Sequence, residues 1–240
     1  FRAAMTDAAM PVTRILREFD CPEIEIETTN YGIRIFALRS LDEETMHVRV
    51  TNLIFPNAIV IPLSNDMVLT QWHVPIDDVT CWWYTIFSSF QDVVDKDAMR
   101  HQRLELYTLP DYAPRRNREN DYGFDADEQR SETYTGMGTD INVHDTWAVE
   151  SMGAVQDRTA EHLGSTDKAI ITNRRMLLRA IDDVERKSDP PFVVTPEDAS
   201  RFRGPISIDT MGSAANWRDW WQCRDRLRRE GSQWATRYGA

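Results

Sequence analysis

The sequence predicts an α+β fold in which an antiparallel sheet is wrapped on one long C-terminal helix. Residues 23–90 alternate apolar and polar side chains in short runs separated by turn residues, a pattern typical of antiparallel strands. Residues from 164 to 189 instead carry apolar side chains at helical spacing. No helical pattern interrupts the strand-like region, so a parallel, doubly wound sheet is not expected.

The strand-like region contains six runs that form a predicted meander. Tyr31-Gly32 lies between the first two runs, and Pro56-Asn57 precedes the fourth. In chain order the runs are EIEIETTN, GIRIFALRS, HVRVTNLIF, NAIVIPL, MVLTQWHVPI and VTCWWYTIFSSF.

A weakly amphipathic helix is expected over residues 92–109, where Pro110 would end it. Residues 111–138 are rich in charged residues, Asn, Gly and Tyr and lack a hydrophobic period. This segment is interpreted as a long polar loop, either a functional lid or a flexible surface excursion.

After His144 the pattern becomes helical through residues 145–163, with Gly153 as a break or kink. A second helix begins near Gly164, ends before Pro190 and has about 20 residues, or about 30 Å. Its expected apolar stripe consists of Ile170, Leu177, Ile181 and Val184.

A sheet of this kind on one long helix is a helix-grip architecture, with a cavity between the two. We expect residues 1–190 to form one domain and residues 191–240 a tail with a short, aromatic-rich helix. Trp217, Trp220 and Trp221 in that helix would dock either on their own domain or on a neighbouring subunit.

Composition narrows the class of protein. The net charge of −11 argues against nucleic-acid binding, which needs clustered Lys and Arg. Cys21, Cys81 and Cys223 are too widely spaced for a zinc or iron–sulfur site, and buried free thiols in a reducing cytoplasm are expected. The sequence shows neither an apolar run of membrane-spanning length nor a signal pattern, so a cytoplasmic location is predicted.

Spacing alone identifies no metal site. The five histidines, at positions 47, 73, 101, 144 and 162, include no pair at i and i+4. On an uninterrupted helix Glu150, Asp157 and Glu161 would share one face, which by itself is typical of a solvated acidic surface. Nothing in the spacing distinguishes Asp157 from its neighbours.

A composite motif does point to a family. Residues 141–178 contain ESMG, then QDR, EHLG, S-x-D and an RR-M-L-L helix, and the strands contain NYGIRIFALR, VRVTNLIFPNAIVIP and WHVPIDD. Together they resemble the C-terminal catalytic domain of the oxygenase subunit of Rieske non-haem iron oxygenases. The branch they resemble is that of phthalate 4,5-dioxygenase, phenoxybenzoate dioxygenase and the O-demethylases, whose catalytic domain is a helix-grip domain of the START or Bet v1-like kind.

The resemblance implies a mononuclear Fe(II) held by two histidines and one carboxylate. The carboxylate lies in the motif that reads QDR here, which makes Asp157 the expected metal ligand. The family's two histidine ligands and its Rieske domain, with a 2Fe-2S cluster, belong to motifs that these 240 residues do not contain. None of the five histidines present is assigned as a ligand.

The resemblance also implies a substrate surface on the strands that carry FPNAIVIP and QWHVPIDD. Asn57, Gln71 and His73 are the candidates for hydrogen bonds to a ring substituent, and Gln71 and His73 share a strand face. Alternatively, Asn57 shapes a turn and His73 is a satisfied core residue. Arg34 and Arg49 would either pair with a substrate carboxylate or lie on the solvent face.

The implied function is hydroxylation or O-demethylation of an aromatic acid, dependent on O₂ and on NAD(P)H through a separate reductase, with or without a ferredoxin. Such subunits usually form homotrimers. The alternatives are a non-catalytic helix-grip domain that binds an apolar ligand and a truncated, inactive subunit. Histidines at the family's spacing in the encoded sequence upstream of Phe1 would favour the oxygenase.

Overall fold

The computed structural model describes residues 11–199 and 204–235. The contacts within the chain divide it into two compact units. Unit 1 consists of Phe1–Glu18 with Val94–Ala160, and unit 2 of Phe19–Val93 with Glu161–Ala240. Each unit has a hydrophobic core of its own.

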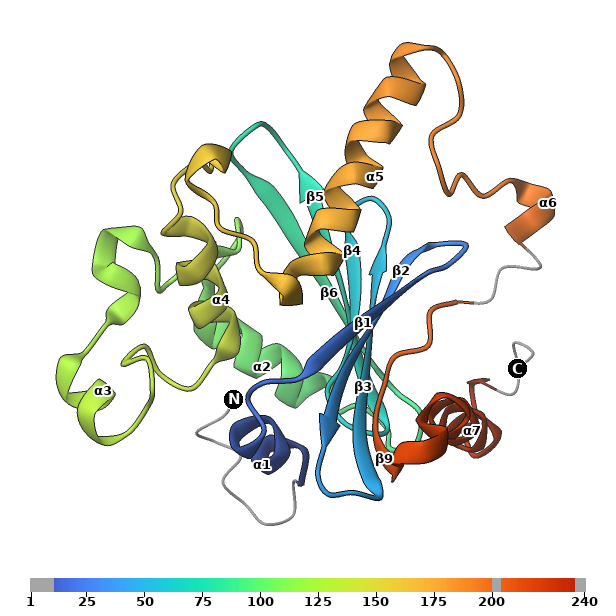
Figure 1. Ribbon diagram of the computed structural model, residues 1–240. Coiled ribbons are helices and arrows are strands. Elements are labelled where there is room, and N and C mark those ends of the chain that lie inside the picture. The colour runs from blue at the N-terminus through green and yellow to red at the C-terminus, as the bar shows by residue number, and fades with distance from the viewer. Residues whose placement is uncertain (1–10, 200–203, 236–240) are drawn as a thin grey trace. The chain divides into compact units, whose positions relative to one another are not determined.

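Unit 2 is built on an antiparallel sheet in which each of the first six strands pairs with the next along the chain. The predicted meander is therefore confirmed, together with the α+β class (Figure 1). The strands are β1 (Glu23–Thr28), β2 (Gly32–Ser40), β3 (Thr45–Ile54), β4 (Ala58–Pro62), β5 (Met67–Pro75) and β6 (Cys81–Ser89).

A seventh strand, β9 (Ile208–Ser213), joins this sheet from the C-terminal part of the chain. It pairs antiparallel with β3, from Thr45 opposite Ser213 to Val50 opposite Ile208. β4 occupies the same side of β3 only from Asn52 to Ile54, which leaves the first part of β3 free for β9. The short sequence of β9 carries no clear alternation, and the sequence did not predict it.

The main core of unit 2 lies between the sheet and helix α7 (Trp217–Glu230). The ring of Phe36 meets Trp217 edge-on at a centroid distance of 5.2 Å and lies 5.7 Å from Trp221, which is 2% exposed. These two tryptophans therefore dock on their own domain. The buried members of the cluster are Phe36, Leu38, Val48, Val50, Ile208 and Trp221.

The long predicted helix is present as α5 (Lys168–Glu185), which lies beside β1 and β2 (Figure 1). Lys168 Nζ at its start donates a hydrogen bond to the carbonyl oxygen of Ile24, at 2.7 Å. The helix and the sheet together confirm the helix-grip architecture. The apolar stripe of this helix is only partly covered, because Ile170, Ile181 and Val184 are about half exposed, at 45%, 55% and 59%.

Three further elements of unit 2 are short, and one of them, the 3₁₀ turn η3 (Ser165–Asp167), leads into α5. Helix α6 (Pro196–Ala199) follows α5, and a 3₁₀ turn, η4 (Ala214–Asn216), leads from β9 into α7. The predicted boundary between a domain, residues 1–190, and a tail, residues 191–240, stays a prediction. In the structure both β9 and α7, which come after that position, belong to unit 2.

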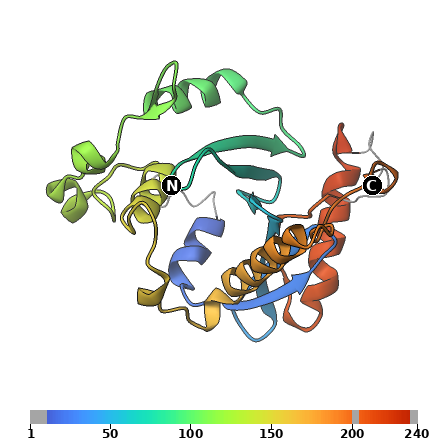
Figure 2. The ribbon, with the colours of Figure 1, turned by 90° about the horizontal axis from the view of Figure 1, so that it is seen from above.

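Unit 1 is mostly helical, with short connecting segments (Figure 2). Its small core contains Tyr122, Met137 and Val143. The expected polar loop at 111–138 therefore contains regular elements and two of the three buried residues of this cluster. The elements are α1 (Pro11–Glu18), α2 (Lys96–Leu106), β7 (Tyr107–Thr108), β8 (Ala113–Pro114), η1 (Arg118–Gly123), α3 (Ala126–Ser131), α4 (Ile141–Glu150) and η2 (Arg158–Ala160).

The helix expected to run on to residue 163 stops at Glu150, where α4 ends. Gly153 has a φ of +91°, a left-handed conformation that glycine tolerates better than any other residue. The predicted break at this glycine is confirmed. Asp157, however, was wrongly placed on a helix: it lies in an irregular segment just before η2.

The cysteines are free thiols, as expected, but they are not buried: Cys21 and Cys81 are exposed and Cys223 is partly exposed. In the part of the chain that the structure describes, no helix has both the length and the apolar character needed to cross a membrane.

Candidate active site

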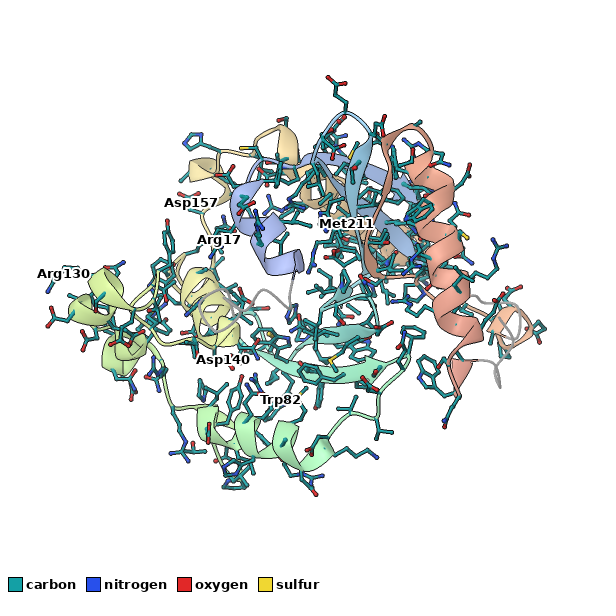
Figure 3. All side chains as sticks on the ribbon, turned by 90° about the horizontal axis from the view of Figure 1, so that it is seen from below. Arg17, Trp82, Arg130, Asp140, Asp157 and Met211 are labelled. Carbon is teal, nitrogen blue, oxygen red and sulfur yellow. The ribbon has the colours of Figure 1, made fainter. Side chains whose placement is uncertain are left out.

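Asp157 presents an exposed, anionic carboxylate (Figure 3). Its Oδ1 accepts hydrogen bonds from the backbone N–H of Thr159, at 2.9 Å, and from the Thr159 hydroxyl, at 2.7 Å. Both hydrogen bonds lower the pKa of Asp157, and the bond from the hydroxyl has the larger effect. The carboxylate is therefore ionised at neutral pH and held in one orientation by the turn that begins η2.

This geometry fits a carboxylate ligand of a hard cation such as Fe(II). The group carries the required negative charge, and both hydrogen bonds from the described residues go to Oδ1, which leaves Oδ2 for a metal. No three His, Cys, Asp or Glu side chains gather as a metal site in residues 11–199 and 204–235. From the resemblance we expect these 240 residues to supply one iron ligand, and Asp157 is suited to that role.

Three of the five histidines interact through a ring nitrogen with another group of the protein. His47 is fully buried and its Nε2 lies 2.5 Å from Asp209 Oδ1. The Nε2 of His144 lies 2.9 Å from both the Thr135 hydroxyl and the Gly138 carbonyl oxygen. The ring therefore connects α4 to residues 135–138 of unit 1. His101 pairs with Glu105 at the surface.

The predicted substrate residues of the sheet belong to unit 2. Gln71 and His73 lie on one face of β5, and Gln71 is only 6% exposed. Desolvation lowers the pKa of His73, so its imidazole is mainly neutral at pH 7. The ring of His73 meets that of Trp83 edge-on, at a centroid distance of 5.4 Å.

Asn57 has a structural contact. Its Nδ2 donates a hydrogen bond to the carbonyl oxygen of His73 at 3.0 Å, while the His73 N–H donates to the Asn57 carbonyl oxygen. The side chain thus holds the start of β4 against the end of β5.

The two arginines considered for a substrate carboxylate are paired within the protein. Arg34 donates to Glu27 and to the Tyr31 hydroxyl, both at 3.0 Å, and its guanidinium lies 5.1 Å from the centre of the Trp221 ring. Arg49 is paired with the buried carboxylate of Asp209. Both side chains connect the strands to the C-terminal segment of unit 2.

Sequence reasoning missed Trp83, which lies opposite His73 across the β5–β6 pair. Its indole Nε1 is buried and has no hydrogen-bond partner among the described residues. The alternation in CWWYTIF separates Trp82 from Trp83 by face, but only the register of the two strands shows which tryptophan stands beside His73.

Comparison with known proteins identifies the family. Residues 4–220 match the family described as LigXa C-terminal domain like. The chain belongs to this family. As a member of the LigXa C-terminal domain like family it is also similar to the phthalate 4,5-dioxygenase oxygenase subunit of Pseudomonas putida, with 28% identity over 167 residues. The alignment covers 67% of this chain and 38% of that relative.

The two findings confirm the resemblance to the catalytic C-terminal domain of Rieske-type oxygenase subunits. The matched range of the LigXa C-terminal domain like family includes Asp157 as well as the six meander strands. The chain spans well under half the length of its curated relative.

Proposed function

We propose that this chain supplies catalytic-domain residues of the oxygenase component of a Rieske-type system. The reaction is hydroxylation or O-demethylation of an aromatic acid, dependent on O₂ and NAD(P)H. The family match over residues 4–220 carries this proposal, because it includes the QDR motif and Asp157. The partners we propose are a reductase, two further copies of the subunit in a homotrimer, and the aromatic substrate, all in the cytoplasm.

Asp157 would hold the mononuclear Fe(II) through Oδ2, together with two histidines from the family's upstream motif. When bound, the iron supplies the site at which dioxygen is activated next to the substrate. Thr159 keeps the Asp157 carboxylate anionic and fixes its direction through the two hydrogen bonds to Oδ1. This is the role expected of groups that orient a metal ligand.

The sheet would orient the substrate. Gln71 is buried on the face that His73 shares, and it presents an amide that can donate and accept. The mainly neutral His73 can donate or accept a single hydrogen bond without adding charge. Leu69 on the same face gives the apolar surface on which an aromatic ring would lie.

Replacement of Asp157 by Ala in the complete oxygenase subunit tests the ligand assignment. We expect iron binding to weaken by more than about 100-fold, beyond the effect usual for a residue that only orients a ligand. Turnover should be lost, whereas the midpoint of thermal unfolding should change little, because the side chain is exposed. Iron content by elemental analysis and aromatic product formation are the two measurements.

Asp77→Ala is a matched control. The Asp77 carboxylate is also exposed and accepts hydrogen bonds from the N–H, at 2.7 Å, and hydroxyl, at 2.7 Å, of a nearby threonine, Thr80. We expect Asp77→Ala to lower the stability of the subunit by a similar small amount and to leave its iron content unchanged. Retention of iron and turnover by Asp157→Ala would remove Asp157 as a ligand. Absence of iron and turnover from the parent subunit itself would favour the non-catalytic or inactive alternatives.

A further inference from the structure

Six residues form a strip on one face of the β5–β6 pair. Directly opposed residues of antiparallel strands share a face, and three such pairs follow one another here. We call this set the β5–β6 strip: Leu69 opposite Phe87, Gln71 opposite Thr85, and His73 opposite Trp83. Strand alternation places it on the face opposite to the one that continues from Phe36 and Val50 under α7.

Trp83 leaves an unmet hydrogen-bond donor in this strip. An indole has one polar atom, and in Trp83 that atom, Nε1, is buried without a partner in the described part of the chain. The guanidinium groups of Arg34 and Arg103 also have a buried nitrogen without a partner, but each group forms a hydrogen bond to a carboxylate through another nitrogen. A buried donor without a partner is costly, so the Trp83 N–H indicates a ligand that completes it.

The composition of the strip indicates what kind of ligand. Its Leu69–Phe87 end is apolar and suits an aromatic ring, whereas Gln71, Thr85, His73 and Trp83 offer hydrogen-bond donors. None of the six residues carries a fixed charge, and the lowered pKa of His73 keeps that ring mainly neutral at pH 7. A carboxylate desolvated here would have no cation of the strip beside it, which is costly, so an uncharged oxygen, as in an ether, a hydroxyl or a ketone, suits the strip better.

We propose that Trp83 is a specificity-determining residue whose indole N–H binds an uncharged oxygen substituent of the aromatic substrate. The proposal rests on the proposed function for the presence of an aromatic substrate. In this proposal the β5–β6 strip binds the uncharged, non-acidic substituent of that substrate. The acidic group would be bound elsewhere.

Two probes that differ in one atom test this. 4-Methoxybenzoate carries an ether oxygen, and 4-ethylbenzoate has a methylene group in its place. The chain with ¹⁵N-labelled tryptophan gives eight indole N–H signals, and Trp83→Phe identifies the Trp83 signal by its loss. We expect 4-methoxybenzoate, but not 4-ethylbenzoate, to shift this signal downfield, as hydrogen bonding does.

Trp83→Phe keeps an aromatic ring at this position and removes the N–H donor. It should weaken the binding of 4-methoxybenzoate by about five- to tenfold, as expected for one hydrogen bond, and that of 4-ethylbenzoate by less than about twofold. Trp82→Phe is the control, because Trp82 is the next residue on β6, faces the other side and is 42% exposed (Figure 3). This variant should bind both probes as the parent protein does.

Equal shifts of the Trp83 signal with both probes, no shift with either, or an unchanged preference in Trp83→Phe would each overturn the proposal. Binding is measured without iron or turnover, so the result is separable from the proposed function. A methoxy-specific shift combined with full iron retention by Asp157→Ala would leave the Trp83 site standing and remove the Asp157 ligand.

Discussion

At the residue scale, several charged and polar side chains of unit 2 connect parts of the chain that are distant in sequence. Asp209 on β9 is fully buried and pairs with His47 and Arg49, both on β3. Asn52 likewise accepts from the Tyr31 hydroxyl at 2.7 Å and donates to the Ile206 carbonyl oxygen at 2.7 Å. Arg49, which the sequence analysis considers for a substrate carboxylate, thereby takes part in the attachment of β9.

Asp209→Asn should destabilise unit 2 strongly. The change removes the buried negative charge that Arg49 and His47 face, and breaking such a buried pair costs about 3–5 kcal/mol. Urea unfolding followed by far-ultraviolet circular dichroism measures the loss. Asp189→Asn, at an exposed position after α5, is the control and should leave the unfolding midpoint nearly unchanged. A similar small effect of Asp209→Asn would mean that the buried carboxylate does not hold β9.

At the element scale, unit 1 depends on side chains that satisfy backbone groups of short segments. Asp125 caps α3 by accepting from the N–H groups of Asp127 and Glu128. Glu128 in turn accepts from the Gly138 N–H at 2.7 Å and from the Thr133 hydroxyl at 2.5 Å. A segment with little hydrophobic pattern is thus ordered by carboxylates, which explains why periodicity alone predicted a loop.

These contacts make the 128–138 segment sensitive to acid. The hydrogen bond from Thr133, followed by that from Gly138, lowers the pKa of Glu128 below its usual value of 4.5. A depressed folded-state pKa means that the stabilisation is complete above pH 4.5 and is lost as the pH falls through the lower, folded-state pKa. We expect no change in the protection factor of the Gly138 amide, its intrinsic exchange rate divided by its observed rate, between pH 7 and about pH 5, and a lower protection factor below about pH 4.

Amide hydrogen exchange followed against pH measures this effect. Glu128→Gln should lower the protection factor of the Gly138 amide at neutral pH and remove most of the acid dependence of that protection factor, because the Gln side chain cannot ionise. Glu132→Gln, at an exposed position in the same segment, should behave as the parent protein does. An acid response that persists unchanged in Glu128→Gln would assign it to other carboxylates.

At the scale of the whole molecule, the two units differ in how much apolar surface they bury. Unit 1 buries a cluster of three residues, Tyr122, Met137 and Val143. Unit 2 buries one cluster of six residues under α7 and another that includes Val60, Val68 and Phe90. Local stability follows buried apolar contacts, so the two units should open with different free energies.

We predict that amides of α4 exchange at least about tenfold faster than those of β3 at neutral pH. Trp221→Ala, which removes a ring at the centre of the unit 2 core, should cost about 3–5 kcal/mol and abolish much of the difference. Gln222→Ala, at the next and exposed position of α7, should have little effect. Equal protection of α4 and β3 in the parent protein would show that the units unfold together.

The sequence by itself determined the meander, the long helix, the break at Gly153 and the family resemblance. These features are local: strand alternation, helical spacing, a residue with φ above zero and linear motifs all lie within short stretches of chain. It also supplied Asp157, through the QDR motif and not through any periodicity.

Only the tertiary structure decided which side chains are already paired. Arg49 is paired with Asp209, and the side-chain nitrogen of Asn52 donates to Ile206; both partners lie more than 150 residues away, on or next to β9, and no local pattern predicts such contacts. The same holds for Trp83, whose place beside His73 depends on the register of β5 and β6. Hydrogen-bond partners and strand register are set by long-range packing, which a linear pattern does not encode.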